Sequence, residues 1–233
     1  MLPLNALRRN RSTPYITYLL LFANVLVFFW ELTLSPRGLY DAFMTLSMVP
    51  CQVGQVPFTE IALDGFRSMF FHGSWLHLLG NMLFLLIFGV HVEEYYGSKM
   101  FLFFYVAAGY GSALLHTLFN MGTCIPVIGA SGAISGVMAA FLLLYPGVKI
   151  KMLSLFRGIP LGTIQVPALL LLGYYFAMDM LDALLPFFDL PVTRPGVAVW
   201  GHIGGFIAGF VFTFVATMFK AAPKVDPLPD LGD

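Results

Sequence analysis

The feature that most constrains this chain is a series of six apolar segments separated by glycine, proline or charged residues. A helix needs roughly 20 apolar residues to cross the ~30 Å core of a bilayer. Hydrophobic residues make up 59% of the 233 residues and charged residues 10%, far from the composition of a soluble domain. We therefore expect an all-α integral membrane protein with six transmembrane helices. The segments are 15–30, 74–92, 100–121, 131–145, 164–185 and 197–219.

These segments predict three parts of the chain. Residues 1–13 form a basic amino terminus, and no small-residue cleavage site follows the first apolar segment, so we expect a retained span rather than a signal peptide. Residues 14–219 form the membrane domain. Residues 220–233 contain three prolines and are expected to be a disordered tail.

The first loop of the membrane domain is long, from 32 to 73. Its two apolar patches, 39–48 and 58–71, are too short and broken to span a bilayer. We expect them to lie along the membrane interface as amphipathic pieces.

Lysine and arginine predict the orientation, because they are enriched in cytoplasmic loops. With the amino terminus in the cytoplasm, nine fall on the cytoplasmic side and three outside. We therefore expect an inner-membrane protein with a cytoplasmic amino terminus, and the net charge of zero excludes a globally basic nucleic-acid binder. The nine are Arg8, Arg9, Arg11, Lys99, Lys149, Lys151, Arg157, Lys220 and Lys224, and the three are Arg37, Arg67 and Arg194.

Cys51 and Cys124 form neither a metal-binding pattern nor a disulfide framework. They could pair if both face an oxidising compartment.

Small residues crowd the start of the fourth segment, at 129–136. A serine flanked by glycines at the start of an apolar helix is either a packing device or a nucleophile. The four-residue spacing of glycines that lets helix backbones touch occurs here and in the sixth segment. We therefore expect close packing of these two helices. The spaced glycines are Gly132 and Gly136, and Gly201, Gly205 and Gly209.

Polar residues of three segments are predicted to lie at one depth below the outer surface. The fourth segment has about 15 residues, roughly 22 Å of helix, so Ser131 should start inside the bilayer. His202 is five residues into the sixth segment, about 7 Å deep, and Asn81 lies about 10 Å deep in the second. His72 and His77 precede Asn81 at the same end of that segment.

This grouping predicts nucleophilic catalysis by Ser131 with His202 as its base, because a serine hydroxyl needs a base to become nucleophilic. The Ser131 amide at a helix start and the Asn81 side chain would stabilise an oxyanion, and His77 and His72 could add a donor or position water. No acid is obviously placed to orient His202, so we expect a dyad. Asp179 and Asp182 are the candidates for a third member. We expect no cofactor and no metal.

Three motifs resemble those of the rhomboid family of intramembrane serine proteases. They are the runs 71–82, 129–132 and 201–205. The resemblance implies a six-helix rhomboid-like bundle in which Ser131 is the nucleophile and His202 the general base. It also implies transmembrane proteins as substrates.

The resemblance also implies roles around this pair. Asn81 and His77 would form the oxyanion site with the Ser131 amide, and Gly129 and Gly132 would allow the strained turn. Glu93 would be a structural acid. Residues 164–185 would be a movable gate and 185–198 a cap. Where some members carry an aromatic residue one turn after the nucleophile, this chain has Ser135.

Three alternatives belong to other classes. A catalytically silent rhomboid-like protein would bind transmembrane helices, but predicts the loss of Ser131 or His202. A transporter using Asp179 and Asp182 favours an internal repeat, which the sequence lacks. A zinc protease with His72, His77 and His202 is disfavoured, because no H-E-x-x-H motif occurs and the first two histidines are not on one helix face.

Overall fold

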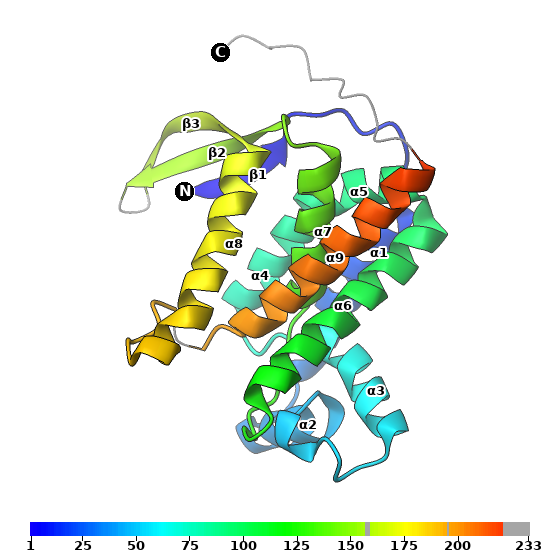
Figure 1. Cartoon of the computed structure of the whole chain (residues 1–233), viewed down its shortest axis with the longest axis vertical. Helices are drawn as coiled ribbons and strands as arrows, with labels where there is room; N and C mark the ends of the chain where they lie inside the picture. Colours follow the sequence, from blue (N-terminus) through cyan, green and yellow to red (C-terminus); the bar gives the residue numbers. More distant parts are fainter. Residues whose placement is uncertain (157–158, 195, 221–233) are drawn as a thin grey trace.

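A computed structural model describes residues 1–156, 159–194 and 196–220, as a helical bundle with a small sheet at one end (Figure 1). The helices are α1 (Tyr15–Glu31), α2 (Pro36–Leu46), α3 (Phe58–Arg67), α4 (Trp75–Phe84), α5 (Val90–Tyr96), α6 (Ser98–Asn120), α7 (Ser131–Leu144), α8 (Ala168–Leu184) and α9 (Val199–Phe219). A π-helical segment, Leu85–Gly89, joins α4 to α5, and short 3-10 helices cover Pro50–Gln52, Ser68–Phe70 and Leu185–Phe188. The strands are β1 (Leu2–Ala6), β2 (Lys149–Phe156) and β3 (Ile159–Pro167). The tail at 221–233, predicted to be disordered, lies outside the described residues.

Four helical stretches of the described chain are long and apolar enough to cross a membrane. They are Trp75–Tyr96, Ser98–Asn120, Ala168–Phe188 and Val199–Phe219. Two further apolar helices are shorter: α1 has 17 residues and α7 has 14. The protein is thus a mostly helical membrane protein, and the count of six spans remains a prediction. The first loop contains α2 and α3, at the end of the bundle opposite the sheet (Figure 1).

The chain is mostly helical, as predicted, but it is not entirely so, because three strands form an antiparallel sheet in the order β1-β2-β3. Ala6 is opposite Ile150 in the first pair, and Lys149 is opposite Pro167 in the second. In β2, Ile150 and Met152 are buried and alternate with lysines, the two-residue period of a half-buried strand. Helix α8 therefore begins at Ala168 rather than at the predicted residue 164, because the residues up to Pro167 belong to β3.

Arg8 belongs to the interior of the sheet end rather than to the surface. Its side chain is buried and donates hydrogen bonds to Glu94 Oε2 at 2.6 Å and His91 Nδ1 at 3.0 Å. The guanidinium also lies 4.4 Å from the centre of the Tyr145 ring. Arg8, which the sequence suggests as an orientation signal, therefore also links the amino terminus to α5 and to the end of α7.

Carboxylates fix both ends of α1. Pro14 precedes this helix and supplies no side-chain cap, so its first amides need an acceptor from elsewhere. Glu93 accepts hydrogen bonds from Ile16 N, Thr17 N and Thr17 Oγ1 at 2.7 to 2.9 Å, and from Ser98 Oγ at 2.6 Å. At the other end, Glu31 accepts the backbone amides of the two residues that lead into α4, at 2.8 and 2.9 Å.

We predict that Glu93→Gln lowers the free energy of unfolding by about 3 kcal/mol. Glutamine keeps the shape, but its single oxygen cannot accept all four hydrogen bonds, and its NH₂ group faces donors. Thermal unfolding in detergent, followed by tryptophan fluorescence, measures the loss. Glu60→Gln on the exposed face of α3 is the matched control. Equal melting temperatures for the two variants would contradict the prediction.

Helix α7 is the buried centre of the bundle and packs against α9 backbone to backbone. A methyl group added at Gly205 would overlap the Gly132 carbonyl oxygen, and one at Gly209 would overlap the backbone of Gly136. Ser112 of α6 fills the space beside Gly132. These contacts fix the start of α7 relative to the start of α9.

Candidate active site

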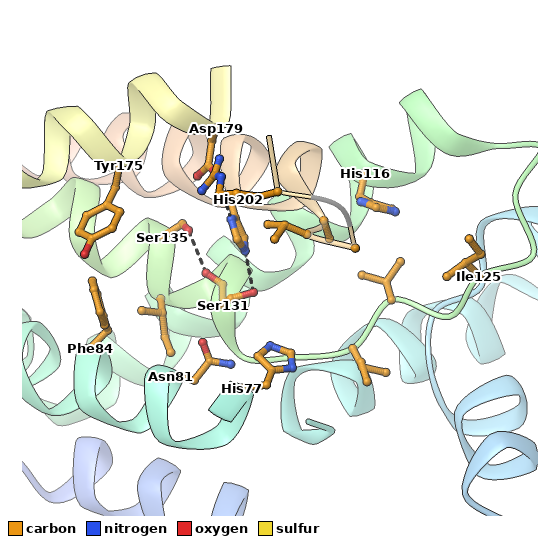
Figure 2. Close-up of a pocket in the computed structure, with 18 of the residues that line it drawn as sticks. His77, Asn81, Phe84, His116, Ile125, Ser131, Ser135, Tyr175, Asp179 and His202 are labelled. Carbon is orange, nitrogen blue, oxygen red and sulfur yellow. Dashed lines mark hydrogen bonds and ion pairs between the residues drawn. The ribbon is translucent and has the colours of Figure 1, made fainter. Parts of the chain in front are cut away.

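A cavity of ≈ 690 Å³ lies at the start of α7 and is lined by residues of α4, α6, α7, α8, α9 and neighbouring loops (Figure 2). Most of the lining surface is apolar, with polar side chains among it, as is usual for ligand sites. The polar and titratable lining residues include His77, Asn81, His116, Asn120, Ser131, Ser135, Asp179, Arg194 and His202.

Ser131 and His202 are in direct contact in this cavity. Ser131 is the first residue of α7, His202 is in the first turn of α9, and Ser131 Oγ lies 2.9 Å from His202 Nε2 (Figure 2). A hydroxyl that donates to Nε2 requires the histidine tautomer with its proton on Nδ1. This is the geometry in which an imidazole can take the serine proton.

Two side chains of α4 point at the loop that leads into Ser131. Gly129 in this loop has φ +120°, a conformation that favours glycine. A methyl group there would come 2.6 Å from His77 Nε2 and 3.6 Å from Asn81 Nδ2. Asn81 Nδ2 is buried and has no hydrogen-bond partner within the described part of the chain. A buried donor left open beside the serine is available for an oxyanion.

His77 can donate to the cavity in one protonation state only. Its Nδ1 lies 2.8 Å from the carbonyl oxygen of His72, which can only accept, so Nδ1 carries a proton. The cavity-facing Nε2 therefore donates only when the ring holds both protons. Of the two predicted side-chain donors, Asn81 is the one available at any pH.

The structure does not bring His72 into the cavity. Its ring is buried behind His77, with the ring centres 5.1 Å apart, and its Nδ1 lies 3.1 Å from Phe70 O. Burial, and after it the charge of His77, lower the pKa of His72 to about 4, so the ring is neutral at pH 7. His72 supports His77 through its carbonyl group and is not placed to contact an oxyanion.

The structure brings further residues to the site. Asp179 is one of the two acids named as candidates for a third member, and its Oδ1 lies 3.3 Å from His202 Nδ1, whereas a dyad was expected. Arg194 and His116 also line the cavity. The sequence signal for Asp179 was its place as an acid in an apolar segment, because an ionisable residue within a membrane helix is a functional candidate by default. Among the described residues, no group of three or more His, Cys, Asp or Glu side chains gathers as metal ligands.

Ser135, one turn after Ser131, also lines the cavity. Its Oγ donates to the Ser131 carbonyl oxygen at 2.9 Å, so the hydroxyl is satisfied within α7. Ser135 thus stands where the family resemblance suggests an aromatic ring.

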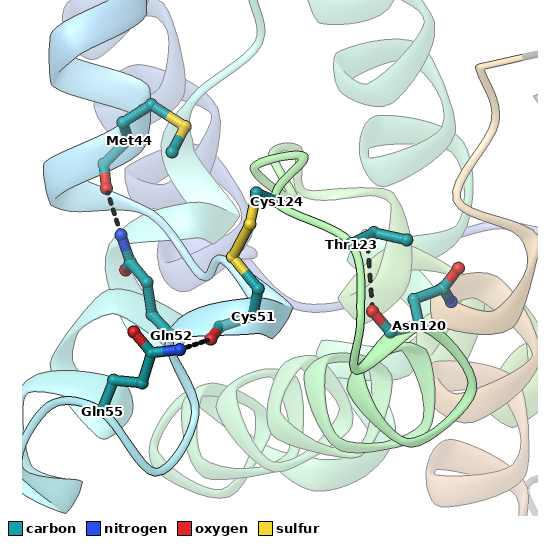
Figure 3. The surroundings of a disulfide bond; sticks show 7 residues. All are labelled: Met44, Cys51, Gln52, Gln55, Asn120, Thr123 and Cys124. Carbon is teal, nitrogen blue, oxygen red and sulfur yellow. Dashed lines mark hydrogen bonds between the residues drawn. A yellow bond between two sulfur atoms is a disulfide. The ribbon is translucent and has the colours of Figure 1, made fainter.

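A disulfide between Cys51 and Cys124 ties the first loop to the loop before Ser131 (Figure 3). Backbone hydrogen bonds support the same contact, from Cys51 N to Thr123 O at 3.0 Å and from Val127 N to Met48 O at 2.8 Å. The loop that carries Gly129 is therefore held at its middle as well as at its ends.

We predict that reduction of this disulfide lowers the free energy of unfolding by about 2 to 4 kcal/mol, because the link closes a long stretch of chain. Melting temperatures with and without reductant measure the effect, and gel mobility reports the bond. The Cys51→Ser, Cys124→Ser double variant should melt at the temperature of the reduced protein and should not respond to reductant. A reductant effect of the same size in that variant would contradict the prediction.

A serine hydroxyl is hydrogen-bonded to an imidazole in a cavity inside an apolar helical bundle. This arrangement is the one expected of a membrane-embedded serine hydrolase. Residues 62–219 match the model of the Rhomboid domain. The match covers well over half of the chain, so this protein belongs to the rhomboid family, as the sequence motifs predicted.

Three curated relatives illustrate the similarity. RHOMBOID-like protein 1 of Arabidopsis thaliana is 29% identical over 141 residues, covering 60% of this chain and 31% of the relative. Rhomboid protein 1, mitochondrial, of Saccharomyces cerevisiae is 31% identical over 140 residues, 58% of this chain and 38% of the relative. Rhomboid protease GluP of Bacillus subtilis is 36% identical over 111 residues, 48% of this chain and 20% of the relative. The chain thus spans less than two fifths of each of these relatives.

Proposed function

We propose that this protein is an intramembrane serine endopeptidase that hydrolyses peptide bonds in or near the transmembrane segments of membrane proteins. The observation that carries the proposal is the 2.9 Å contact between Ser131 Oγ and His202 Nε2 inside the cavity. Asn81 Nδ2, which has no hydrogen-bond partner among the residues that the structure describes, adds the donor that acyl transfer requires.

In the proposed reaction, His202 Nε2 takes the Ser131 proton as Oγ attacks the scissile carbonyl carbon. The resulting oxyanion is stabilised by the Ser131 amide at the start of α7 and by Asn81 Nδ2. His202 then gives its proton to the leaving amine, which produces an acyl-enzyme and the first product. A water molecule, deprotonated by the same imidazole, releases the second product and restores Ser131.

The substrate must unwind locally, because a helix hides each backbone carbonyl in its own hydrogen-bond ladder. We therefore expect small residues at the cleavage site and helix-destabilising residues after it.

The proposal includes six spans, with α1 and α7 as the two shorter ones, and an active site that opens to the outer face of a cell inner membrane. The lysine and arginine bias supports this orientation. So does the disulfide near Ser131, because disulfides persist in oxidising compartments.

The test uses the full chain in proteoliposomes with a single-span substrate that carries Ala-Gly-Ser within the span. Cleavage of the substrate and labelling by a fluorophosphonate are expected, with the label on Ser131. Unchanged cleavage by Ser131→Ala would refute the proposal. Binding of the substrate helix without cleavage or labelling would favour the silent rhomboid-like alternative.

A further inference from the structure

The second nitrogen of the His202 ring has an acceptor. If Nε2 accepts the Ser131 proton, Nδ1 carries a hydrogen that needs a partner. Asp179 Oδ1 on α8 lies 3.3 Å from Nδ1, and Figure 2 places Asp179 on the side of His202 away from Ser131. Ser131, His202 and Asp179 therefore form one chain of contacts across α7, α9 and α8.

Asp179 belongs to a charged cluster that ties α8 to the segment before α9. Arg194 Nη2 donates to Asp179 Oδ1 at 2.9 Å, and Arg194 Nε donates to Asp182 Oδ2 at 2.7 Å. Thr193 donates to Asp182 Oδ1 at 2.7 Å from both its amide and its hydroxyl group. The two acids are three residues apart and share one face of α8.

The charges of this cluster do not cancel. Two carboxylates meet one guanidinium, so a net negative charge faces His202 Nδ1. Both aspartate side chains are largely shielded, with 11% and 0% of their surface exposed, so screening by water is weak.

We propose that Asp179 is a positioning residue for His202, with Arg194 holding its carboxylate in place. The carboxylate accepts the Nδ1 hydrogen, selects the tautomer whose Nε2 is free to accept, and stabilises the imidazolium formed when the Ser131 proton arrives. Asp179 does not take up the Ser131 proton, which resides on Nε2. The inference rests on the proposed function and replaces the expected dyad by three linked groups.

The contact between His202 Nδ1 and Asp179 Oδ1 is long, at 3.3 Å, because Arg194 competes for the same oxygen. Arg194 takes the shorter hydrogen bond to the Asp179 oxygen that faces Nδ1. Hydrogen bonds of this kind are often long without substrate and shorten when it binds. Asp179 and Arg194 also line the cavity, so a bound substrate lies against the groups that set this distance.

The test compares Asp179→Asn with Asp189→Asn, which removes an exposed carboxylate after α8 that does not line the cavity. Asp179→Asn is expected to lower kcat and the rate of fluorophosphonate labelling by about 10- to 100-fold, with little change in KM. Asp189→Asn should keep the labelling rate within about twofold, and asparagine tolerates the left-handed backbone at this position. Asp179→Glu should recover part of the rate, because it restores the carboxylate.

Rates per folded molecule separate positioning from mere stability. A variant that is only less stable contains fewer active molecules, whereas loss of the orienting carboxylate slows each folded molecule, so all rates are divided by the folded fraction. Arg194→Gln provides the test if Asp179→Asn does not fold, because it removes the guanidinium that holds the carboxylate in place. It should lower kcat per folded molecule, since the carboxylate is then less well placed against His202.

Three results would overturn the inference: an Asp179→Asn rate per folded molecule within about twofold of native, equal losses in the Asp179→Asn and Asp189→Asn variants, or a native kcat in Arg194→Gln. A native protein that neither cleaves nor labels would instead refute the proposed function. Native activity with an unaffected Asp179→Asn would refute this inference alone.

Discussion

Ser131→Ala is expected to abolish cleavage of a single-span substrate, with a loss of at least about 10³-fold, and His202→Ala is expected to do the same. Ser131→Ala removes the attacking oxygen, and His202→Ala removes the imidazole whose Nε2 lies 2.9 Å from that oxygen. Because the two groups act in one step, the double variant should be no slower than either single variant. Initial rates in proteoliposomes measure all three.

Ser98→Ala is the matched control for the serine variant. Ser98 is the first residue of α6, as Ser131 is of α7, and its hydroxyl bonds to Glu93 rather than to a cavity group. It should lose stability but keep cleavage once measured below its melting temperature. Residual cleavage by Ser131→Ala at the level of Ser98→Ala would remove Ser131 from the proposed mechanism.

The sequence predicts those parts of the fold that depend on local patterns. Apolar run length located the main helices to within a few residues, apart from the start of α8. Glycine spacing led us to expect close packing of the fourth and sixth segments, and the structure brings Gly132 and Gly205 together. The helical rise per residue predicted a similar depth for Ser131 and His202, because the depth along a straight helix follows from the number of residues.

The parts that were missed depend on contacts between distant segments. The pairing of β1 with β2 joins segments that are far apart in the chain. Strand β1 lies in the basic amino-terminal segment, which the sequence alone suggests only as a signal for membrane orientation. Asp179 reaches His202 because of how α8 lies against α9, which residue spacing does not encode. The disulfide was left open in the sequence, since two cysteines give no information on their distance.

Gly205→Ala is expected to have the second-largest effect, because the site depends on backbone contact between α7 and α9. The added methyl group would overlap the Gly132 carbonyl oxygen, and a backbone atom inside a helix cannot move away alone. The helices must separate, at a cost of about 1 to 3 kcal/mol in the free energy of unfolding. Since displacement of a reacting group by about 1 Å can cost 10²-fold in rate, we expect cleavage to fall by about that factor.

Gly173→Ala separates this effect from that of adding a methyl group to any membrane helix. Gly173 lies in α8 with nothing within 4 Å of the added atom, and alanine is the better helix former by about 1 kcal/mol. This variant should therefore be at least as stable as the native protein and as active. Both variants are compared by melting temperature and by fluorophosphonate labelling at a temperature where each is folded. Normal labelling of Gly205→Ala would mean that close contact of α7 and α9 does not set the distance between Ser131 and His202, whereas slow labelling of a folded variant would show that it does.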